Sequence, residues 1–157
     1  MKKLLFLLSM FLIVISSKAQ VKGDIFIGAG SQLSSQKIID LAITPMIGYQ
    51  ATNKLQVGLN VVLNDYGGTD YDFVQIYIKA YPSQKLNLKD NIKTFIQFSA
   101  GTSSSDNYTN IGFNVGATTF LGNSSWFYIE PSIGWSHSDF GHNSSLVGFN
   151  VTCGIRL

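Results

Sequence analysis

The stretch SLVGFNVTCGIRL, residues 145–157, decides the fold of this chain. Apolar residues alternate along it with small or polar ones, without a break. Successive side chains of a β-strand point to opposite faces, so the segment forms a strand with one apolar and one small, polar face. The apolar face carries Val147, Phe149, Val151, Cys153, Ile155 and Leu157. A strand of a membrane β-barrel has this pattern, because its outer face contacts lipid.

The beginning of the sequence has the pattern of a secretory signal peptide. A basic start is followed by the apolar run Leu4–Ile15, which is too short to cross a bilayer. Small residues then precede a predicted cleavage site between Ala19 and Gln20. We therefore expect a cleaved helical signal peptide over residues 1–19 and a single mature domain over residues 20–157.

Removing the signal peptide changes the charge of the protein. It takes away three of the eleven Lys and Arg residues and leaves eight against nine Asp and Glu, a net charge of −1. No basic face remains, so nucleic acid is not an expected partner. Charged residues make up 13% of the sequence, well below the roughly 25% of soluble domains. Cys153 is the single cysteine, and one cysteine forms neither an internal disulfide nor a multi-cysteine metal site.

Eight segments have the alternation of a strand, and turn-rich breaks separate them. Each is about ten residues long, the length with which a tilted strand crosses a bilayer. The sequence therefore predicts an all-β fold: a closed, eight-stranded, antiparallel, up-and-down transmembrane β-barrel. The predicted strands span Asp24–Gln32, Asp40–Gln50, Leu55–Asn64, Tyr71–Tyr81, Ile92–Gly101, Ile111–Thr119, Trp126–Trp135 and Ser145–Leu157.

Alternation alone does not say which face lies inside, and a soluble lipocalin-like barrel would turn its apolar face inward. The polar face decides between the two. A soluble exterior carries many charged side chains, whereas this face is mostly Gly, Asn, Gln, Ser and Thr. We therefore place the polar face in the lumen and the apolar face against lipid. Phe95 and Trp126 fall on the inward parity of their strands.

An even number of strands puts both termini on one side of the membrane, the periplasmic side. The predicted outer connections include a loop over Asp65–Asp70. Aromatic residues at strand ends fit two interfacial girdles. The lower girdle would contain Tyr49, Tyr81 and Phe127, and the upper one Tyr71, Tyr108 and Trp135.

On these features the chain resembles the small eight-stranded outer-membrane barrels, such as OmpX and the membrane anchor of OmpA. The resemblance covers Gln20–Leu157 and rests on strand number, alternation and the C-terminal strand. That strand is similar to the signal read by the barrel-assembly machinery, although family members typically end on an aromatic residue and this chain ends on Leu157. The resemblance implies an outer-membrane location, a lipid environment and contact with the assembly machinery.

Eight strands enclose only enough space for side chains, so no open channel is expected. A structural polar network is expected in the lumen, and a proton or ion path is the alternative. Its residues would be Gln75, Lys79, Lys93, Asn114, Glu130, Asn150 and Arg156, with Asn60, Tyr77 and Gln97 as further candidates. Glu130 is the only glutamate and lies mid-strand on the inward face, where a charge is costly unless it is paired. Lys79, Lys93 and Arg156 are its candidate partners.

Two histidines and one aspartate fall in the last outer connection, at His137, Asp139 and His142. Such a set could hold a metal ion, but polar surface residues are the expected interpretation, and no metal or cofactor is predicted. His142 and Ser144 also resemble the His-x-Ser pair of outer-membrane lipid A deacylases. No Asp or Glu follows Ser144 to orient the histidine, so no enzyme activity is predicted.

The sequence thus predicts a monomeric outer-membrane barrel with a structural or surface-interaction role. The partners would be outer-membrane lipid, the assembly machinery and an extracellular partner bound through short loops. A lipid-modifying enzyme, a narrow pore and a soluble ligand-binding barrel are the alternatives.

Overall fold

A computed structural model describes seven stretches of the chain. The signal peptide and its predicted cleavage site lie outside them. No helix in the described part of the chain is long and apolar enough to span a membrane. The described residues are 23–34, 44–66, 69–82, 92–103, 108–121, 126–139 and 144–157.

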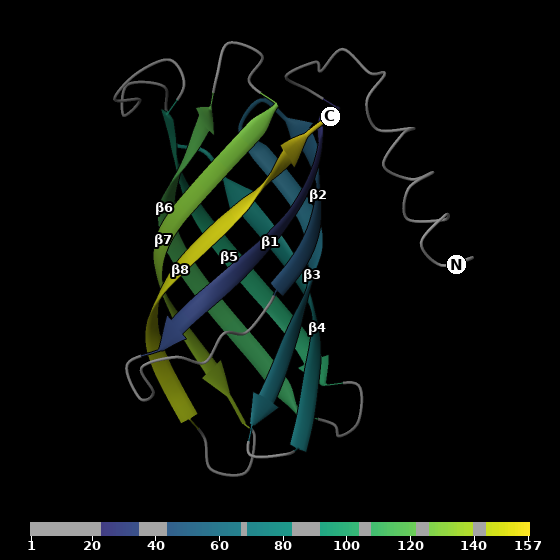
Figure 1. Cartoon of the computed structure of the whole chain (residues 1–157), viewed down its shortest axis with the longest axis vertical. Helices are drawn as coiled ribbons and strands as arrows, with labels where there is room; N and C mark the ends of the chain where they lie inside the picture. Colours follow the sequence, from purple (N-terminus) through teal and green to yellow (C-terminus); the bar gives the residue numbers. More distant parts are fainter. Residues whose placement is uncertain are drawn as a thin grey trace, which may run out of the picture.

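The described residues form eight antiparallel strands in one closed barrel (Figure 1). Each strand pairs with its neighbours in the sequence, and β1 pairs with β8 to close the sheet. The predicted fold class is therefore confirmed. The strands are β1 (Ile25–Ser34), β2 (Thr44–Thr52), β3 (Leu55–Tyr66), β4 (Thr69–Ala80), β5 (Ile92–Ser103), β6 (Thr109–Leu121), β7 (Phe127–Ser138) and β8 (Ser144–Arg156).

Both ends of the described chain lie at the same end of the barrel, which we call the terminal end. There the backbone amide of Ile25 donates to the Leu157 carbonyl and the Leu157 amide donates back, at 3.1 and 2.8 Å. The turn between β2 and β3 lies at this end too, uppermost in Figure 1. We call the opposite end, where β1, β3, β5 and β7 finish, the loop end.

At the loop end the strands other than β2 are longer than the sequence predicted, and residues 40–43, where the second strand was expected to begin, lie outside the described residues. The loop expected over Asp65–Asp70 was wrong, because β3 runs to Tyr66 and pairs with Thr69 of β4. Only residues 67 and 68 separate the two strands in the sequence. Polar residues beyond the apolar part of a strand therefore did not mark its end. β5, β6 and β7 also extend past their predicted bounds.

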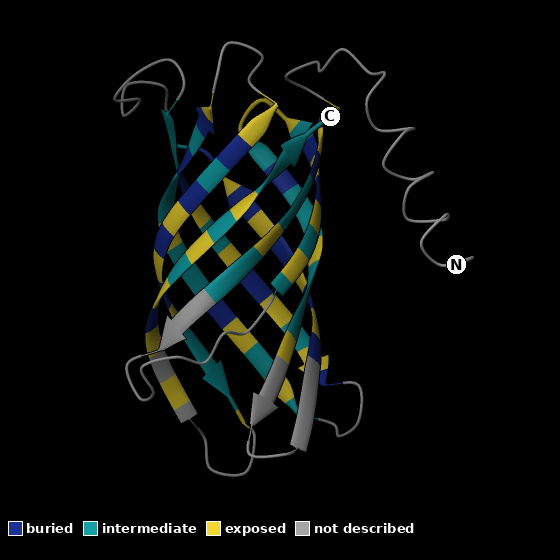
Figure 2. Cartoon of the chain, viewed as in Figure 1, coloured by how far each residue is buried: buried dark blue, intermediate teal, exposed yellow. Residues whose placement is uncertain are grey.

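Buried and exposed residues alternate along the strands (Figure 2), and the exposed positions include many large apolar side chains, whereas the buried ones are polar or aromatic. Along β4, Val74, Ile76 and Ile78 are exposed, whereas the residues between them are buried. Ile76 on β4 and Ile133 on β7 are both 63% exposed, an arrangement opposite to that of a water-soluble barrel. The predicted orientation of the two faces is thereby confirmed, including Phe95 in the interior.

Trp126 departs from its predicted place on the inward face. It is 55% exposed, because it precedes β7 at the rim of the barrel and is not held by the strand. Tyr81 departs in the opposite sense. It was expected in the lower aromatic girdle but is buried, since it continues the inward parity of β4 beyond Ala80. Tyr49 and Phe127, its expected companions, are exposed on the outer face.

Candidate functional site

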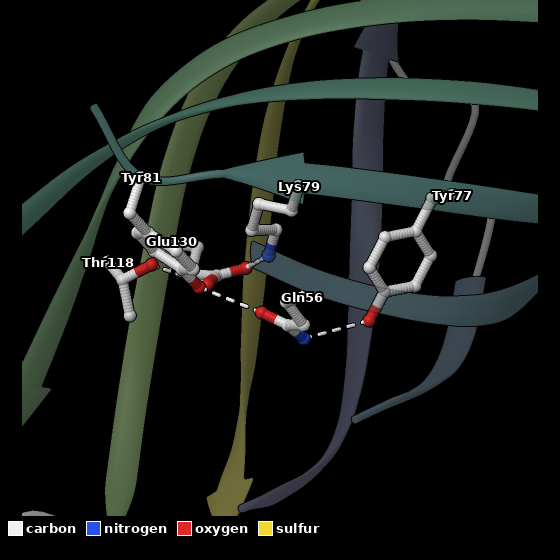
Figure 3. A network of polar contacts seen from close by, with 6 residues as sticks. All are labelled: Gln56, Tyr77, Lys79, Tyr81, Thr118 and Glu130. Carbon is white, nitrogen blue, oxygen red and sulfur yellow. Dashed lines mark hydrogen bonds and ion pairs between the residues drawn. The ribbon is translucent and has the colours of Figure 1, made fainter. Parts of the chain in front are cut away.

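The best-developed group of side chains lies across the lumen, towards the terminal end. We call it the lumen cluster: Gln56, Tyr77, Lys79, Tyr81, Thr118 and Glu130. Its members come from β3, β4, β6, β7 and the residue after β4, so they converge from different sides of the wall (Figure 3). All six side chains belong to buried residues. Each lies on the inward face of its strand, so the alternation of side chains along the strands points all of them into the lumen.

An ion pair forms the centre of the lumen cluster. Lys79 Nζ lies 2.6 Å from Glu130 Oε2, and the two side chains are 1% and 3% exposed. The other carboxylate oxygen, Oε1, accepts a hydrogen bond of 2.6 Å from the Thr118 hydroxyl. Both oxygens of the only glutamate are therefore engaged, as a buried charge requires. Of the three candidate cations for Glu130, the structure brings Lys79 to it.

Aromatic rings and an amide complete the cluster. Lys79 Nζ lies 4.6 Å from the centroid of the Phe95 ring and 5.7 Å from that of Tyr77, distances suited to cation–π attraction. The Tyr81 hydroxyl donates to Gln56 Oε1 at 2.8 Å, and Gln56 Nε2 donates to the Tyr77 hydroxyl at 2.9 Å.

Glycines on neighbouring strands of the sheet make room for two tyrosines of the lumen, Tyr77 and Tyr128. A Cβ at Gly48 or Gly58 would collide with Tyr77, and one at Gly28 or Gly154 would collide with the hydroxyl of Tyr128. Tyr77 and Tyr128 are fully buried as a result. These glycines on the polar face of the sequence are thus sites over which a tyrosine from a neighbouring part of the sheet lies: Gly58 pairs with Tyr77 and Gly154 with Tyr128 across adjacent strands.

Neutral amides occupy the half of the lumen nearer the loop end. Asn60 Nδ2 donates to Gln75 Oε1 at 2.9 Å, and Gln75 Nε2 donates to Asn110 Oδ1 at 2.7 Å. Asn150 Nδ2 donates to Asn114 Oδ1 at 2.9 Å. The structure therefore brings Asn114 and Asn150 together as one pair, and places Gln75 in a separate chain of amides.

A second charged group lies at the terminal end, and we call it the terminal mouth: Asp24, Lys93, Phe120 and Arg156. Arg156 Nε lies 3.6 Å from Asp24 Oδ2, too far for a hydrogen bond but close enough for an ion pair. Burial raises the pKa of the Asp24 carboxyl above its ordinary value, and the positive charges of Arg156 and Lys93 oppose that shift. Arg156 and Lys93 were candidate partners of Glu130, but the structure holds them here instead.

Several members of these groups were not selected from the sequence. Gln56, Thr118 and Tyr128 lie on the inward face of their strands. Asp24 does too, because it lies two residues before the inward-facing Phe26. Parity was therefore a sufficient signal for their burial. It carries no information about partners, because Lys79 and Glu130 lie on strands that are not neighbours in the sheet.

The candidate metal ligands near the loop end have other partners. Asp139 accepts hydrogen bonds from the Thr109 backbone nitrogen at 2.6 Å and from the Thr109 hydroxyl at 2.9 Å. His137 Nδ1 lies 2.9 Å from the Ser145 hydroxyl, and its ring stacks on Trp135. His142 and the Ser144 side chain lie outside the described residues. Within the described part, no three His, Cys, Asp or Glu residues form a group suited to a metal ion.

No family model matches the sequence, and no curated protein matches it. Solved structures do match, with low sequence identity. The N-terminal β-barrel domain of Pseudomonas aeruginosa OprF is 9% identical, with a TM-score of 0.60 over 87% of this chain and 98% of that chain. The de novo designed TMB2.3 is 10% identical, with a TM-score of 0.56 over 85% and 92%.

The Yersinia pestis outer membrane protein Ail, in a phospholipid bilayer nanodisc, is 11% identical, with a TM-score of 0.48 over 87% and 100%. The likeness to the OprF domain and to TMB2.3 extends over nearly the whole length of each. At these identities it is a likeness of fold. The resemblance to small eight-stranded barrels that the sequence indicated is confirmed at that level.

Proposed function

We propose that this protein is an outer-membrane β-barrel with a closed lumen and a structural or surface-interaction role. The observation that carries the proposal is the inverted polarity of the barrel. Large apolar side chains such as Ile76, Phe98 and Ile133 are more than 60% exposed, while a lysine and a glutamate are buried inside. Soluble monomers rarely expose continuous apolar patches of more than a few hundred Å², whereas a lipid-facing surface must be apolar.

The packing of the lumen supports a role without a solute channel. Tyr77, Lys79 and Tyr128 are almost completely inaccessible to solvent, and the Lys79–Glu130 ion pair spans the lumen between β4 and β7. An open path would leave such side chains hydrated. A narrow pore therefore remains the less favoured function, and bilayer conductance tests it.

The expected location and partners follow from the same proposal. Residues 1–19 would export the chain and be cleaved before Gln20. β8, whose Val147, Phe149 and Val151 are exposed on the outer face, would carry the signal for the barrel-assembly machinery. The protein would act as a monomer in lipid, and its loop end would meet an extracellular partner. No enzyme activity is proposed.

The decisive experiment is electrophoresis of isolated outer membranes in SDS, with and without boiling. A closed membrane barrel resists SDS when cold, so its mobility should change on heating. Recovery in the soluble periplasmic fraction, with no heat shift, would contradict the proposal and favour a soluble ligand-binding barrel. Purified protein in planar bilayers should then show no steady conductance. Loss of a lipid modification on mutation of His142 would instead favour the enzyme alternative.

A further inference from the structure

The charges of the terminal mouth are unbalanced. Lys93 and Arg156 both point into the lumen and approach the same ring, with Lys93 Nζ 5.8 Å and Arg156 Cζ 4.6 Å from the centroid of Phe120. Among the side chains that the structure describes, Asp24 is the carboxylate that interacts with both cations. Within that part of the chain, two cationic side chains thus share one carboxylate side chain.

Asp24 compensates these cations only weakly. Its Oδ2 is 3.6 Å from Arg156 Nε, and its Oδ1 is buried without a hydrogen-bond partner. Arg156 Nε is likewise buried without a hydrogen-bond acceptor. Among the described residues, Lys93 makes no ion pair at all. Buried polar groups and charges are costly unless they are paired, so the terminal mouth lacks an acceptor.

The lumen cluster shows the contrast within the same barrel. There, Lys79 has its own carboxylate at 2.6 Å, and both carboxylate oxygens are engaged. The chain thus pairs lysine with glutamate one to one in the closed part of the lumen. At the terminal mouth, by contrast, the described side chains are two cations and one carboxylate.

We propose that the terminal mouth binds a small oxyanion, a phosphate or carboxylate group, between Lys93 and Arg156. The oxyanion would supply the acceptor that Arg156 Nε lacks and the negative charge that Lys93 lacks. A guanidinium matches planar or tetrahedral oxyanions with its fixed donors, and an ammonium adds a point charge with rotatable donors. Asp24 holds Arg156 from one side and limits how strongly the site attracts anions. Phe120 gives both cations a common apolar support.

A phosphate group could come from a free ion or from a lipid headgroup near the rim. Trp126 is exposed at this end, and its carbonyl accepts the backbone amide of Arg156 at 2.5 Å, so the mouth adjoins the rim of the barrel. The site recognises the same chemistry in both cases. Competition between the two sources distinguishes them.

The test is titration of the folded full barrel with inorganic phosphate, in bilayers of zwitterionic lipid and at constant ionic strength set by chloride. The readout is the NMR amide shifts of Lys93, Phe120 and Arg156. We expect saturable shifts with phosphate and none with chloride. Replacing part of the lipid by phosphatidylglycerol then identifies the source, because a bound headgroup weakens the apparent phosphate affinity and a free ion leaves it unchanged.

Three variants test whether phosphate binding depends on this site. Lys93→Met should weaken phosphate binding about tenfold, the effect of losing one charge-assisted hydrogen bond. Lys54→Met is the matched control, since Lys54 is an exposed lysine of the β2–β3 turn at the same end, and its loss should change the affinity less than about twofold. Asp24→Asn should strengthen binding, because it removes the competing carboxylate.

The absence of saturable shifts, or equal effects of the two lysine variants, would overturn the proposal. Weaker binding by Asp24→Asn would overturn it as well. Should that variant fail to give a heat-shifted band, the comparison of the two lysine variants decides the matter alone.

Discussion

The ion pair of the lumen cluster offers the most direct test of how this barrel is stabilised. Glu130→Leu removes the carboxylate that lies 2.6 Å from Lys79 Nζ and leaves the lysine buried with its charge unpaired. Breaking a buried pair from one side costs about 3–5 kcal/mol, because the remaining charge keeps its desolvation penalty. The Thr118 hydroxyl loses its acceptor in the same variant, at a cost of about 1 kcal/mol.

Removing both charges should behave differently. In the double variant Lys79→Met with Glu130→Leu no charge remains buried, and replacing a whole buried pair by apolar residues is often neutral or stabilising by about 1–4 kcal/mol. We therefore expect the double variant to be more stable than Glu130→Leu alone, although it carries one more substitution. Lys54→Met is the control, since Lys54 is an exposed lysine of the β2–β3 turn, and the free energy of unfolding of this variant should stay close to that of the wild type.

Equilibrium unfolding by urea in lipid vesicles measures these free energies, with the cold SDS mobility of each variant as the check of folding. The coupling energy from the double-mutant cycle isolates the contribution of the pair. A Glu130→Leu barrel that unfolds at the same urea concentration as the wild type would refute the reasoning. So would a double variant whose loss equals the sum of the two single losses, because the two charges would then be independent.

Three further predictions concern the outer face, an unpaired hydroxyl and the loop end. Phe98→Lys should destabilise the barrel in bilayers by about 2–4 kcal/mol, because Phe98 is exposed on the outer face. Thr102→Lys, nearer the loop end, should cost only about 0–1 kcal/mol. Equal, small effects of the two variants on urea unfolding would indicate that water, not lipid, covers that face. Tyr128→Phe removes a buried hydroxyl without a hydrogen-bond partner and should raise the free energy of unfolding by about 1 kcal/mol; a decrease would show that the hydroxyl is satisfied. Hydrogen bonds from Thr109 hold the pKa of Asp139 below its ordinary value of 3.8, so this contact is complete above that pH and is lost as the pH falls through the lowered value. The amide shift of Thr109 should follow this titration, and in Asp139→Asn it should not titrate in that range.

The orientation of the side chains followed from the sequence because a strand has only two faces. On β4, alternation alone separated Ile76 and Ile78 from Tyr77 and Lys79, and it placed Phe95 inside although phenylalanine is apolar. Tyr81 obeys the same rule and not the expectation of an aromatic girdle. It is buried, and its hydroxyl donates to Gln56 inside the lumen.

The partners inside the lumen could not be predicted in the same way. Lys79 on β4 meets Glu130 on β7, and two strands separate them along the sheet. Which inward side chains meet across a barrel depends on the tilt and stagger of all eight strands together. Lys93 and Arg156 had the same parity and lay towards the same end, so the sequence left three cations open for one glutamate. The ends of several strands were predicted wrongly for another reason: polar residues outside the apolar belt can continue a strand.

The polarity of this barrel determines which of its residues tolerate substitution. The apolar outer face tolerates exchange among lipophilic residues, because lipid chains adapt to any of them. The interior is different, because its buried polar groups depend on particular protein partners. Tyr77 needs glycine at positions 48 and 58, and Glu130 needs both Lys79 and Thr118. The inward residues should therefore tolerate single exchanges less well than the apolar outward residues. For this chain the usual rule of soluble proteins, in which the apolar core is the demanding part, is reversed.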